Sequence, residues 1–332
     1  MRLRGSPANI ALLAVTLAVF VAAAEIALRV TGFVSLTPHP PWIYAVHPDP
    51  DIGYALKPNT REKAYRATVT TNSVGLRGSE VDPAKPTAAV LGDSIAFGYG
   101  VEDGETLPMR LQERMDGWNV VNGAAPGYTL GQEAALYQDR IAKLDPKILI
   151  LVFYWNDLDD QRPPVLDRLG ILRGPDWRES DEPQKSWMER NSAIYVAVQK
   201  FLSARREGAN LAKQKEEYKA NMFQDDVVQE KLDAYDAVLD RFARSLPPAL
   251  QKLFVIWPEK HVHYLARPKI IAMAEKRGFK TLDLYQIFGN DPESLSWDTV
   301  HPSAKTIDEA AGVIAAALEY HGFLPLPAPA HP

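Results

Sequence analysis

Four short blocks of the sequence carry side chains that could act together in catalysis. The first is Gly92-Asp93-Ser94, where a short apolar run stops at a turn and residues able to start a helix follow. A serine at the carboxyl edge of a sheet, against the N–H groups of a helix, is well placed to act as a nucleophile. Because turns favour the same three residues wherever a strand ends, this block indicates a nucleophile only together with the others.

The other blocks supply the remaining groups that a serine hydrolase needs. They are the segments 121–127, 154–157 and 298–302. His301 is the candidate base for the Ser94 proton, and Asp298 is the candidate carboxylate that fixes the imidazole tautomer and stabilises the imidazolium. The backbone N–H groups of Ser94 and Gly127 and the side-chain amide of Asn156 are the candidate oxyanion donors. Together these residues predict nucleophilic attack on an acyl carbonyl.

Each block taken alone also has a purely structural interpretation. Asp298 and His301 could cap the last helix, and Asn156 with Asp157 could form a turn at the end of a strand. All four blocks occur in one chain, each at a predicted strand end or helix start. This joint context favours the catalytic interpretation.

The four blocks, in this order, resemble those of the SGNH hydrolases, also called GDSL esterases and lipases. The resemblance runs from about residue 87 to residue 321, apart from a helical insertion. The resemblance implies that four residues are those that name the family: Ser94, Gly127, Asn156 and His301. Asp298 would complete the triad. In one departure from the family pattern, Tyr154 stands two residues before Asn156, where the family often has Gly. The resemblance therefore does not specify the width of the acyl pocket.

Apolar runs alternate with helical patterns over most of this region. The predicted strands are 88–91, 120–121, 148–154, 253–257 and 281–284, and the predicted helices between them are 108–115, 131–144 and 268–277. This alternation predicts an α/β fold with a central parallel sheet and helices on both faces. The expected fold is a flavodoxin-like three-layer sandwich, which the resemblance specifies as the SGNH hydrolase fold. In such sheets the carboxyl ends of the strands carry the site, where Ser94, Gly127 and Asn156 would fall.

The rest of the chain is predicted to fall into additions around this domain. The expected organisation is a signal anchor at 1–32, a strand-and-turn arm at 33–86, the hydrolase domain at 87–323 with a helical insertion at 159–250, and a disordered tail at 324–332. The arm could instead be a loose stalk. The insertion could be a lid over the active face or a peripheral pair of helices. A final Ala-rich helix is expected at 303–321.

The N-terminus indicates export. Arg2 and Arg4 precede an apolar run at 8–24, and Glu25 follows it. The run suits an uncleaved membrane anchor, while cleavage after Ala24 would release the protein. In both cases the positive residues stay inside, so the domain is expected in the periplasm or at the cell surface. The N-terminus and two further runs, 53–59 and 71–77, also resemble bacterial membrane-anchored members of the family.

Composition excludes several other classes of function. The net charge is −5 with no basic stripe, so nucleic acid is not expected as a partner, and the absence of cysteine excludes thiolate chemistry. No metal or organic cofactor is expected. His261 and His263 alternate on one segment without a carboxylate at a recognised ligand spacing, so we expect surface or pocket-rim histidines rather than metal ligands. Three tryptophans beside the predicted site loops form either a binding wall or core packing; they are Trp155, Trp257 and Trp297.

These observations predict a serine esterase that works through an acyl-serine intermediate. The expected substrate is a small-molecule or glycan ester, above all an O-acetyl group on envelope or secreted polysaccharide, with lipid or small acyl esters next. If a sugar hydroxyl replaced water as acceptor, the same triad would make an O-acyltransferase. A non-catalytic glycan-binding envelope protein is the alternative of another class, which the complete triad disfavours.

Overall fold

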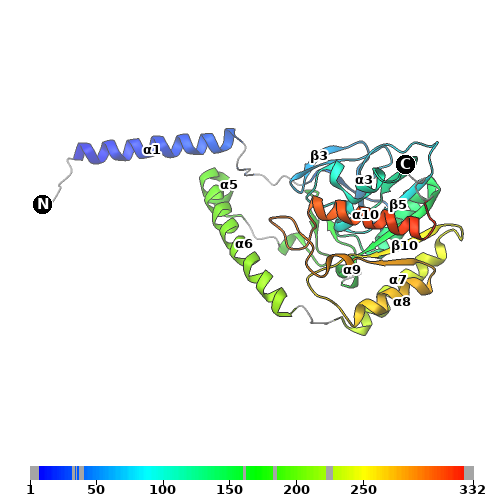
Figure 1. Cartoon of the computed structure of the whole chain (residues 1–332). Coiled ribbons are helices and arrows are strands. Elements are labelled where there is room, and N and C mark those ends of the chain that lie inside the picture. The colour runs from blue at the N-terminus through cyan, green and yellow to red at the C-terminus, as the bar shows by residue number, and fades with distance from the viewer. Residues whose placement is uncertain are drawn as a thin grey trace, which may run out of the picture. The chain divides into compact units, whose positions relative to one another are not determined.

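The structure is a computed structural model that describes residues 7–31, 34, 36, 41–159, 162–181, 185–221 and 227–324 (Figure 1). The predicted tail at 324–332 lies outside the described residues, apart from Leu324. The chain divides into two compact units. One comprises Met1–His39 with Arg178–Lys213, and the other comprises Pro40–Trp177 with Gln214–Pro332.

The first unit contains α1 (Pro7–Val30), α5 (Trp187–Asn191) and most of α6 (Ala193–Asn221). Helix α1 carries charged side chains only at Glu25 and Arg29, near its end, and is long and apolar enough to cross a membrane. A signal sequence near an N-terminus has the same length and composition. Glu25, close to the end of α1, accepts hydrogen bonds from the backbone N–H groups of Ala193 (2.7 Å) and Ile194 (3.0 Å). This carboxylate therefore caps the N-terminus of α6.

The second unit is built on a five-stranded parallel sheet in the order β11-β10-β7-β5-β6. The strands are β5 (Thr87–Leu91), β6 (Asn119–Asn122), β7 (Pro146–Phe153), β10 (Gln251–Ile256) and β11 (Lys280–Asp283). All five residues of β5 are buried, as are all but one of β7. Strands covered on both faces show as apolar runs, which is why the sequence predicted the central strands β5 and β7. The edge strand β11 has no buried residue, and its prediction came from its place in the alternating pattern.

Helices cover this sheet and complete the predicted three-layer α/β fold (Figure 1). They are α3 (Leu107–Gln112), α4 (Leu130–Leu136), α7 (Gln229–Ser245), α8 (Ala266–Lys276) and α10 (Ala304–Tyr320), with the short α2 (Ser94–Phe97) and α9 (Tyr285–Phe288) at strand ends. Helix α3 packs on α10, and α7 packs on α4 and α8. Helix α7 falls within the predicted insertion, yet it buries Leu232, Tyr235, Leu239 and Phe242 in the core.

Three pairs of short strands lie outside or beside the main sheet as small hairpins. They are β1 (Tyr44–Val46) with β2 (Tyr54–Leu56), β3 (Arg61–Ala64) with β4 (Ala67–Thr70), and β8 (Val165–Leu166) with β9 (Leu172–Arg173). The first two pairs belong to the predicted arm. Tyr54 of β2 is fully buried, and its hydroxyl donates to the Pro126 carbonyl at 2.6 Å. Tyr128 in turn donates to the Tyr54 carbonyl at 2.6 Å. From residue 41 onward the arm is thus packed on the domain and is no loose stalk.

Candidate active site

Ser94 is the first residue of α2, directly after β5. Gly92 makes the turn with φ +151°, and a Cβ atom there would lie 2.7 Å from the Cβ of Ala96, so the turn requires glycine. Asp93 caps α2, because its carboxylate accepts from the backbone N–H of Ile95 at 2.8 Å. The serine is therefore held at the carboxyl end of the central sheet, at the start of a helix.

A chain of hydrogen bonds connects Ser94 to the two other predicted triad residues. The Ser94 Oγ lies 2.9 Å from Nε2 of His301, and Nδ1 of the same ring lies 2.7 Å from Oδ2 of Asp298. The other oxygen of Asp298 accepts from the backbone N–H groups of Val300 (2.6 Å) and His301 (3.0 Å). Burial alone would raise the pKa of Asp298, but these hydrogen bonds outweigh it and lower the pKa to about 2. An ionised Asp298 can only accept, so Nδ1 carries the proton and Nε2 is left to take one from serine.

Two tyrosines that sequence reasoning missed stack behind the histidine ring. Tyr99 stacks on His301 with ring centroids 4.1 Å apart, and Tyr65 lies 4.3 Å from Tyr99. Tyr65 and Arg66 form the tip of the β3–β4 hairpin, both with positive φ. The Arg66 guanidinium lies over the Trp297 ring, 4.4 Å from its centroid. The arm thus supports the His301 ring through aromatic contacts between segments far apart in the sequence.

The three predicted oxyanion donors are placed less completely. The backbone N–H groups of Ser94 and Gly127 make no hydrogen bond within the described part of the chain. Gly127 has φ +80°, and a Cβ atom there would lie 3.2 Å from both Pro164 and the Tyr54 hydroxyl. The Asn156 amide donates one N–H to Asp93 at 2.8 Å, which orients the amide beside Ser94. Its second N–H is left to donate to an oxyanion. Among the described residues no hydrogen bond joins Gly127 to Ser94 or Asn156, so a shared oxyanion hole stays a prediction.

A cleft of about 430 Å³ opens beside Ser94. Its polar lining comes from Ser94, Asn156, Asp159, Lys231, Glu259, His261, His263 and His301. Of the three tryptophans, Trp155 lines this cleft, whereas Trp257 is buried in the core. The Trp297 ring lies on Tyr99, which stacks on His301, with the Trp297 and Tyr99 ring centroids 5.9 Å apart. Only Trp155 therefore serves as a wall of the cleft.

The expectation that no carboxylate accompanies His261 and His263 is wrong. Glu259, two residues before His261, hydrogen-bonds with Nε2 of His263 and lies 3.8 Å from Nδ1 of His261. His263 is buried against the Trp155 ring, with centroids 3.7 Å apart, and is not a rim residue. The signal was present in the sequence, because Glu259, His261 and His263 alternate along one loop.

Comparison with known proteins decides the family. The model of the GDSL-like lipase/acylhydrolase family matches residues 90–306, which is well over half of the chain. The chain belongs to this GDSL-like family. The match covers the segments that bear Ser94, Asn156 and His301, and it confirms both the predicted family and an enzyme of the serine hydrolase type that acts on esters. No curated protein shows a significant sequence match to the chain.

Several solved structures are similar in fold to this GDSL-like chain at low identity. TesA is 14% identical, with a TM-score of 0.43 over 70% of this chain and 98% of its own. A putative lipolytic protein of the G-D-S-L family from Desulfitobacterium hafniense is 12% identical, with a TM-score of 0.40 over 70% and 100%. An acetyl xylan esterase from Butyrivibrio proteoclasticus is 12% identical, with a TM-score of 0.39 over 74% and 66%. These similarities are too low to inform the substrate of this GDSL-like enzyme.

Beneath the site, the GDSL-like domain buries carboxyl groups that the sequence did not mark as unusual. Glu133 on α4 and Asp157 after β7 are both buried, and Asp157 accepts from the Tyr154 N–H at 3.1 Å. Burial raises the pKa of Glu133 well above its usual range, and the charges of Asp157 and Asp93 add to this shift. Burial raises the pKa of Asp157 in the same way. The folded state therefore keeps a proton on Glu133 to a higher pH than the unfolded chain does.

Replacing Glu133 by Gln is therefore expected to change how stability depends on pH. Above the pKa of an unfolded glutamate, about 4.3, the folded state keeps a proton that the unfolded state has released. The free energy of unfolding then falls as pH rises, by at most about 1.4 kcal/mol per pH unit for each group, until the pH passes the raised pKa. The variant loses this contribution, so its melting temperature relative to the native chain should rise between pH 5.5 and pH 8.

Thermal unfolding of both chains in detergent at several pH values measures this difference. We expect a relative gain of about 3 °C or more for Glu133→Gln at the higher pH, from roughly 2–4 °C per kcal/mol. Glu62→Gln, on an exposed glutamate of β3, should show no such trend. An equal difference between Glu133→Gln and the native chain at every pH would show that Glu133 is ionised in the folded state.

Proposed function

We propose that this GDSL-like enzyme is an esterase that removes O-acetyl groups from envelope or secreted glycan through an acyl-serine intermediate. The observation that carries the proposal is the hydrogen-bonded chain from Ser94 through His301 to Asp298. Its geometry allows His301 to take the serine proton while Asp298 stabilises the resulting imidazolium.

The proposed reaction has two steps. The Ser94 Oγ attacks the ester carbonyl, its proton passes to Nε2 of His301, and the carbonyl oxygen becomes an oxyanion. The N–H groups of Ser94 and Gly127 and the Asn156 amide would stabilise this charge. Each donor would lower the activation barrier by roughly 3 kcal/mol. His301 then protonates the leaving alcohol. Water attacks the acyl-serine, His301 takes the water proton, and the acid leaves as Ser94 regains its hydrogen.

The lining of the cleft supports a hydroxylated acyl donor over a long-chain lipid. Charged side chains of Asp159, Lys231 and Glu259 line it together with the catalytic groups. Its apolar part is short and comes from Trp155, Leu158, Val227 and Val300. Such a surface suits hydrogen bonding to sugar hydroxyls, whereas a fatty acyl chain needs an apolar wall. The bulky Tyr154 at the position where the family often has Gly also lines the cleft, and this suits a small acyl group.

The full chain in detergent tests the proposal with esters of increasing acyl length and with an acetylated polysaccharide. We expect acetate release from p-nitrophenyl acetate and from acetylated xylan, and at least about tenfold lower kcat/KM for the octanoate ester, because one misfit methylene alone costs about 1–3 kcal/mol. Preference for octanoate would contradict a glycan substrate. Transfer of the acetyl group to an added oligosaccharide instead of water would identify an acyltransferase.

We also propose that α1 is an uncleaved anchor that holds the enzyme on the outer side of the membrane. Support comes from the apolar length of α1 and from Arg2 and Arg4 before it. Alkaline carbonate extraction of host membranes should leave the full-length chain in the pellet. A soluble chain that begins after Ala24 would show that the segment is a cleaved signal.

A further inference from the structure

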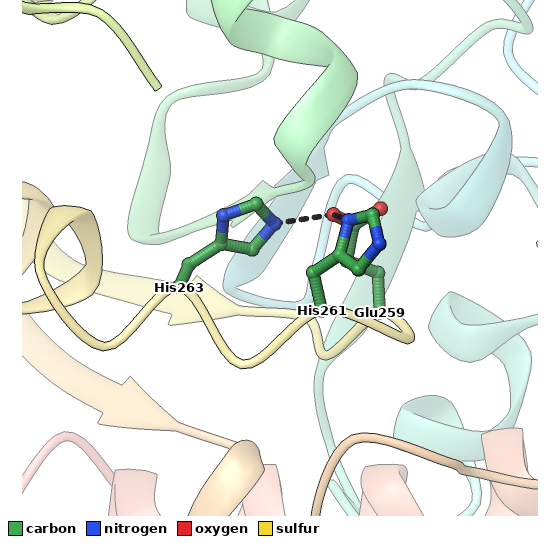
Figure 2. A group of neighbouring side chains, drawn as sticks. All are labelled: Glu259, His261 and His263. Atoms are coloured by element: carbon green, nitrogen blue, oxygen red, sulfur yellow. Dashed lines mark hydrogen bonds and ion pairs between the residues drawn. The ribbon is translucent and has the colours of Figure 1, made fainter. Parts of the chain in front are cut away.

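A cluster of two histidines and a glutamate lines the same cleft as Ser94 but takes no part in the proposed reaction. Glu259, His261 and His263 lie on the loop that follows β10, and Figure 2 shows the three side chains converging. One potential ligand atom from each lies within 4.8 Å of the other two. The alternation along the loop places these side chains together while Lys260, between them, pairs with Asp291 instead.

The loop that carries the cluster is held in place by its neighbours. The hydroxyl of Tyr285 accepts from the Glu259 N–H at 3.1 Å and donates to the His261 carbonyl at 2.8 Å. Asn290 donates to the Lys260 carbonyl at 2.6 Å. These contacts fix the backbone on both sides of the first histidine. A metal site needs such support, because ligands held in advance cost less entropy to order.

His263 is held in an unusual way for a histidine in a loop. Its backbone has φ +48°, a conformation that costs energy for any residue with a Cβ atom. The ring stacks on Trp155, and its Nδ1 is buried without a hydrogen-bond partner among the described residues. Only Nε2, directed at Glu259, makes a polar contact. Backbone strain of this kind is concentrated at functional sites. We therefore attribute a functional role to the orientation of the His263 ring, which directs Nε2 at Glu259.

We propose that Glu259, His261 and His263 bind one divalent zinc ion in the cleft. Two imidazoles and one carboxylate are a preferred ligand set for Zn²⁺, which binds nitrogen and oxygen at about 2.0–2.2 Å. Ligand atoms around such an ion lie roughly 3.3 Å apart, by tetrahedral geometry from these bond lengths. The separation of 3.8 Å between Glu259 and His261 needs only side-chain rotation to reach this value. Binding would also separate Glu259 from His263 and place the ion between them.

The proposed ion would keep at least one coordination position for a ligand other than protein. Three protein ligands leave the fourth tetrahedral position open, as in zinc sites that bind water or substrate. All three residues line the cleft that Ser94 and His301 also line. The ion would therefore bind a hydroxyl or carboxylate of a molecule that occupies the cleft. This site does not depend on which ester the enzyme hydrolyses.

The test uses the full chain in detergent, stripped with a chelator, dialysed and then titrated with zinc chloride in a calorimeter. We expect one Zn²⁺ per chain. Loss of a ligand in His261→Ala or Glu259→Gln should weaken binding by more than the roughly 10- to 100-fold that loss of a supporting outer residue costs. Cobalt added in place of zinc should give the strong visible absorption of a four-coordinate ion, which His261→Ala should abolish.

Two variants control the experiment. His321→Ala removes a histidine at the end of α10, outside the cluster, and should leave zinc binding unchanged. His263 is buried, so His263→Ala could disturb the fold, and circular dichroism must accompany it; the partly exposed His261 avoids this problem. Absence of stoichiometric zinc binding in the folded native chain would overturn the proposal. Zinc binding that survives both His261→Ala and Glu259→Gln would overturn it as well.

Discussion

Replacing Ser94 by Ala in the full chain is expected to lower kcat/KM for p-nitrophenyl acetate by about 10⁴-fold or more, because a group that acts as one unit with its base cannot be partly replaced. The substitution removes only Oγ, whose hydrogen-bond partners among the described residues are Nε2 of His301 at 2.9 Å and Oδ2 of Asp93 at 3.4 Å. The fold should therefore be retained, with a melting temperature close to that of the native chain. Steady-state hydrolysis and thermal unfolding measure the two quantities.

Covalent labelling makes the same prediction independent of substrate choice. A fluorophosphonate should add once to the native chain, because the serine oxygen attacks phosphorus and expels fluoride, and peptide mapping should place the adduct on Ser94. Ser94→Ala should gain no mass. Ser203→Ala, the same change on the exposed face of α6, should label and hydrolyse as the native chain does. Labelling of Ser94→Ala, or hydrolysis that it retains, would rule out Ser94 as the nucleophile.

The sheet could be predicted from the sequence, and the residues of the proposed triad could be placed at its edge, for one physical reason. A buried parallel strand shows as a continuous apolar run, and the groups that follow it are collected at one edge of the sheet. Ser94 and Asn156 therefore follow predicted strands that the structure pairs as neighbours, β5 and β7. His301 and Asp298 precede a helix whose capping serine marks its start.

Contacts between distant segments could not be predicted in the same way. The stack of Tyr65 and Tyr99 on His301 joins three parts of the chain, and no spacing within one segment encodes it. Glu133 occupies the first turn of α4, where an exposed glutamate is ordinary, so its burial leaves no trace in the local pattern. Helix α7 lies in a region rich in charged residues. These residues separate its buried apolar positions in the sequence, so the local pattern did not indicate that one face of the helix packs in the core.

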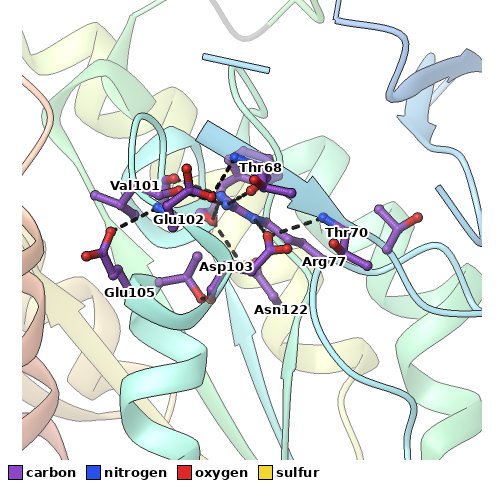
Figure 3. A network of polar contacts seen from close by, with 12 residues as sticks. Thr68, Thr70, Arg77, Val101, Glu102, Asp103, Glu105 and Asn122 are labelled. Atoms are coloured by element: carbon purple, nitrogen blue, oxygen red, sulfur yellow. Dashed lines mark hydrogen bonds and ion pairs between the residues drawn. The ribbon is translucent and has the colours of Figure 1, made fainter. Parts of the chain in front are cut away.

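Arg77 also makes contacts with distant segments that the sequence could not predict. Its substitution is expected to have the largest effect on stability. The sequence drew attention to the run 71–77 by resemblance only. In the structure the Arg77 guanidinium is almost fully buried and lies at the centre of a polar network (Figure 3). It donates to Asp103 and to the carbonyl oxygens of Thr68, Phe97, Gly98 and Val101, at 2.8–3.1 Å. All five N–H groups of an arginine can be used in this way, and lysine has no equivalent.

This network ties the arm to the helix that begins with Ser94. Thr68 belongs to β4, whereas Phe97 and Gly98 end α2, so the Arg77 side chain joins β4 to the helix that begins with Ser94. Glu102 reinforces the junction by accepting from the Thr68 N–H at 2.8 Å. A buried cation that satisfies several acceptors holds the geometry of the site even where its net contribution to stability is small. Loss of the cation is different, because it leaves those acceptors buried and unpaired.

The Arg77→Met variant is therefore expected to lose about 3–5 kcal/mol of stability, the usual effect of breaking a buried ionic network from one side. For a domain of this size the melting temperature should fall by roughly 10 °C. Arg77→Lys should lose nearly as much, since an ammonium reaches fewer of the acceptors. Arg61→Met, on the exposed β3 strand, should stay within about 0.5 kcal/mol of the native chain. Equal melting temperatures for Arg77→Met and Arg61→Met would contradict this prediction. They would show that water hydrogen-bonds to the acceptors once the guanidinium is removed, so that the junction behind Ser94 is accessible to solvent.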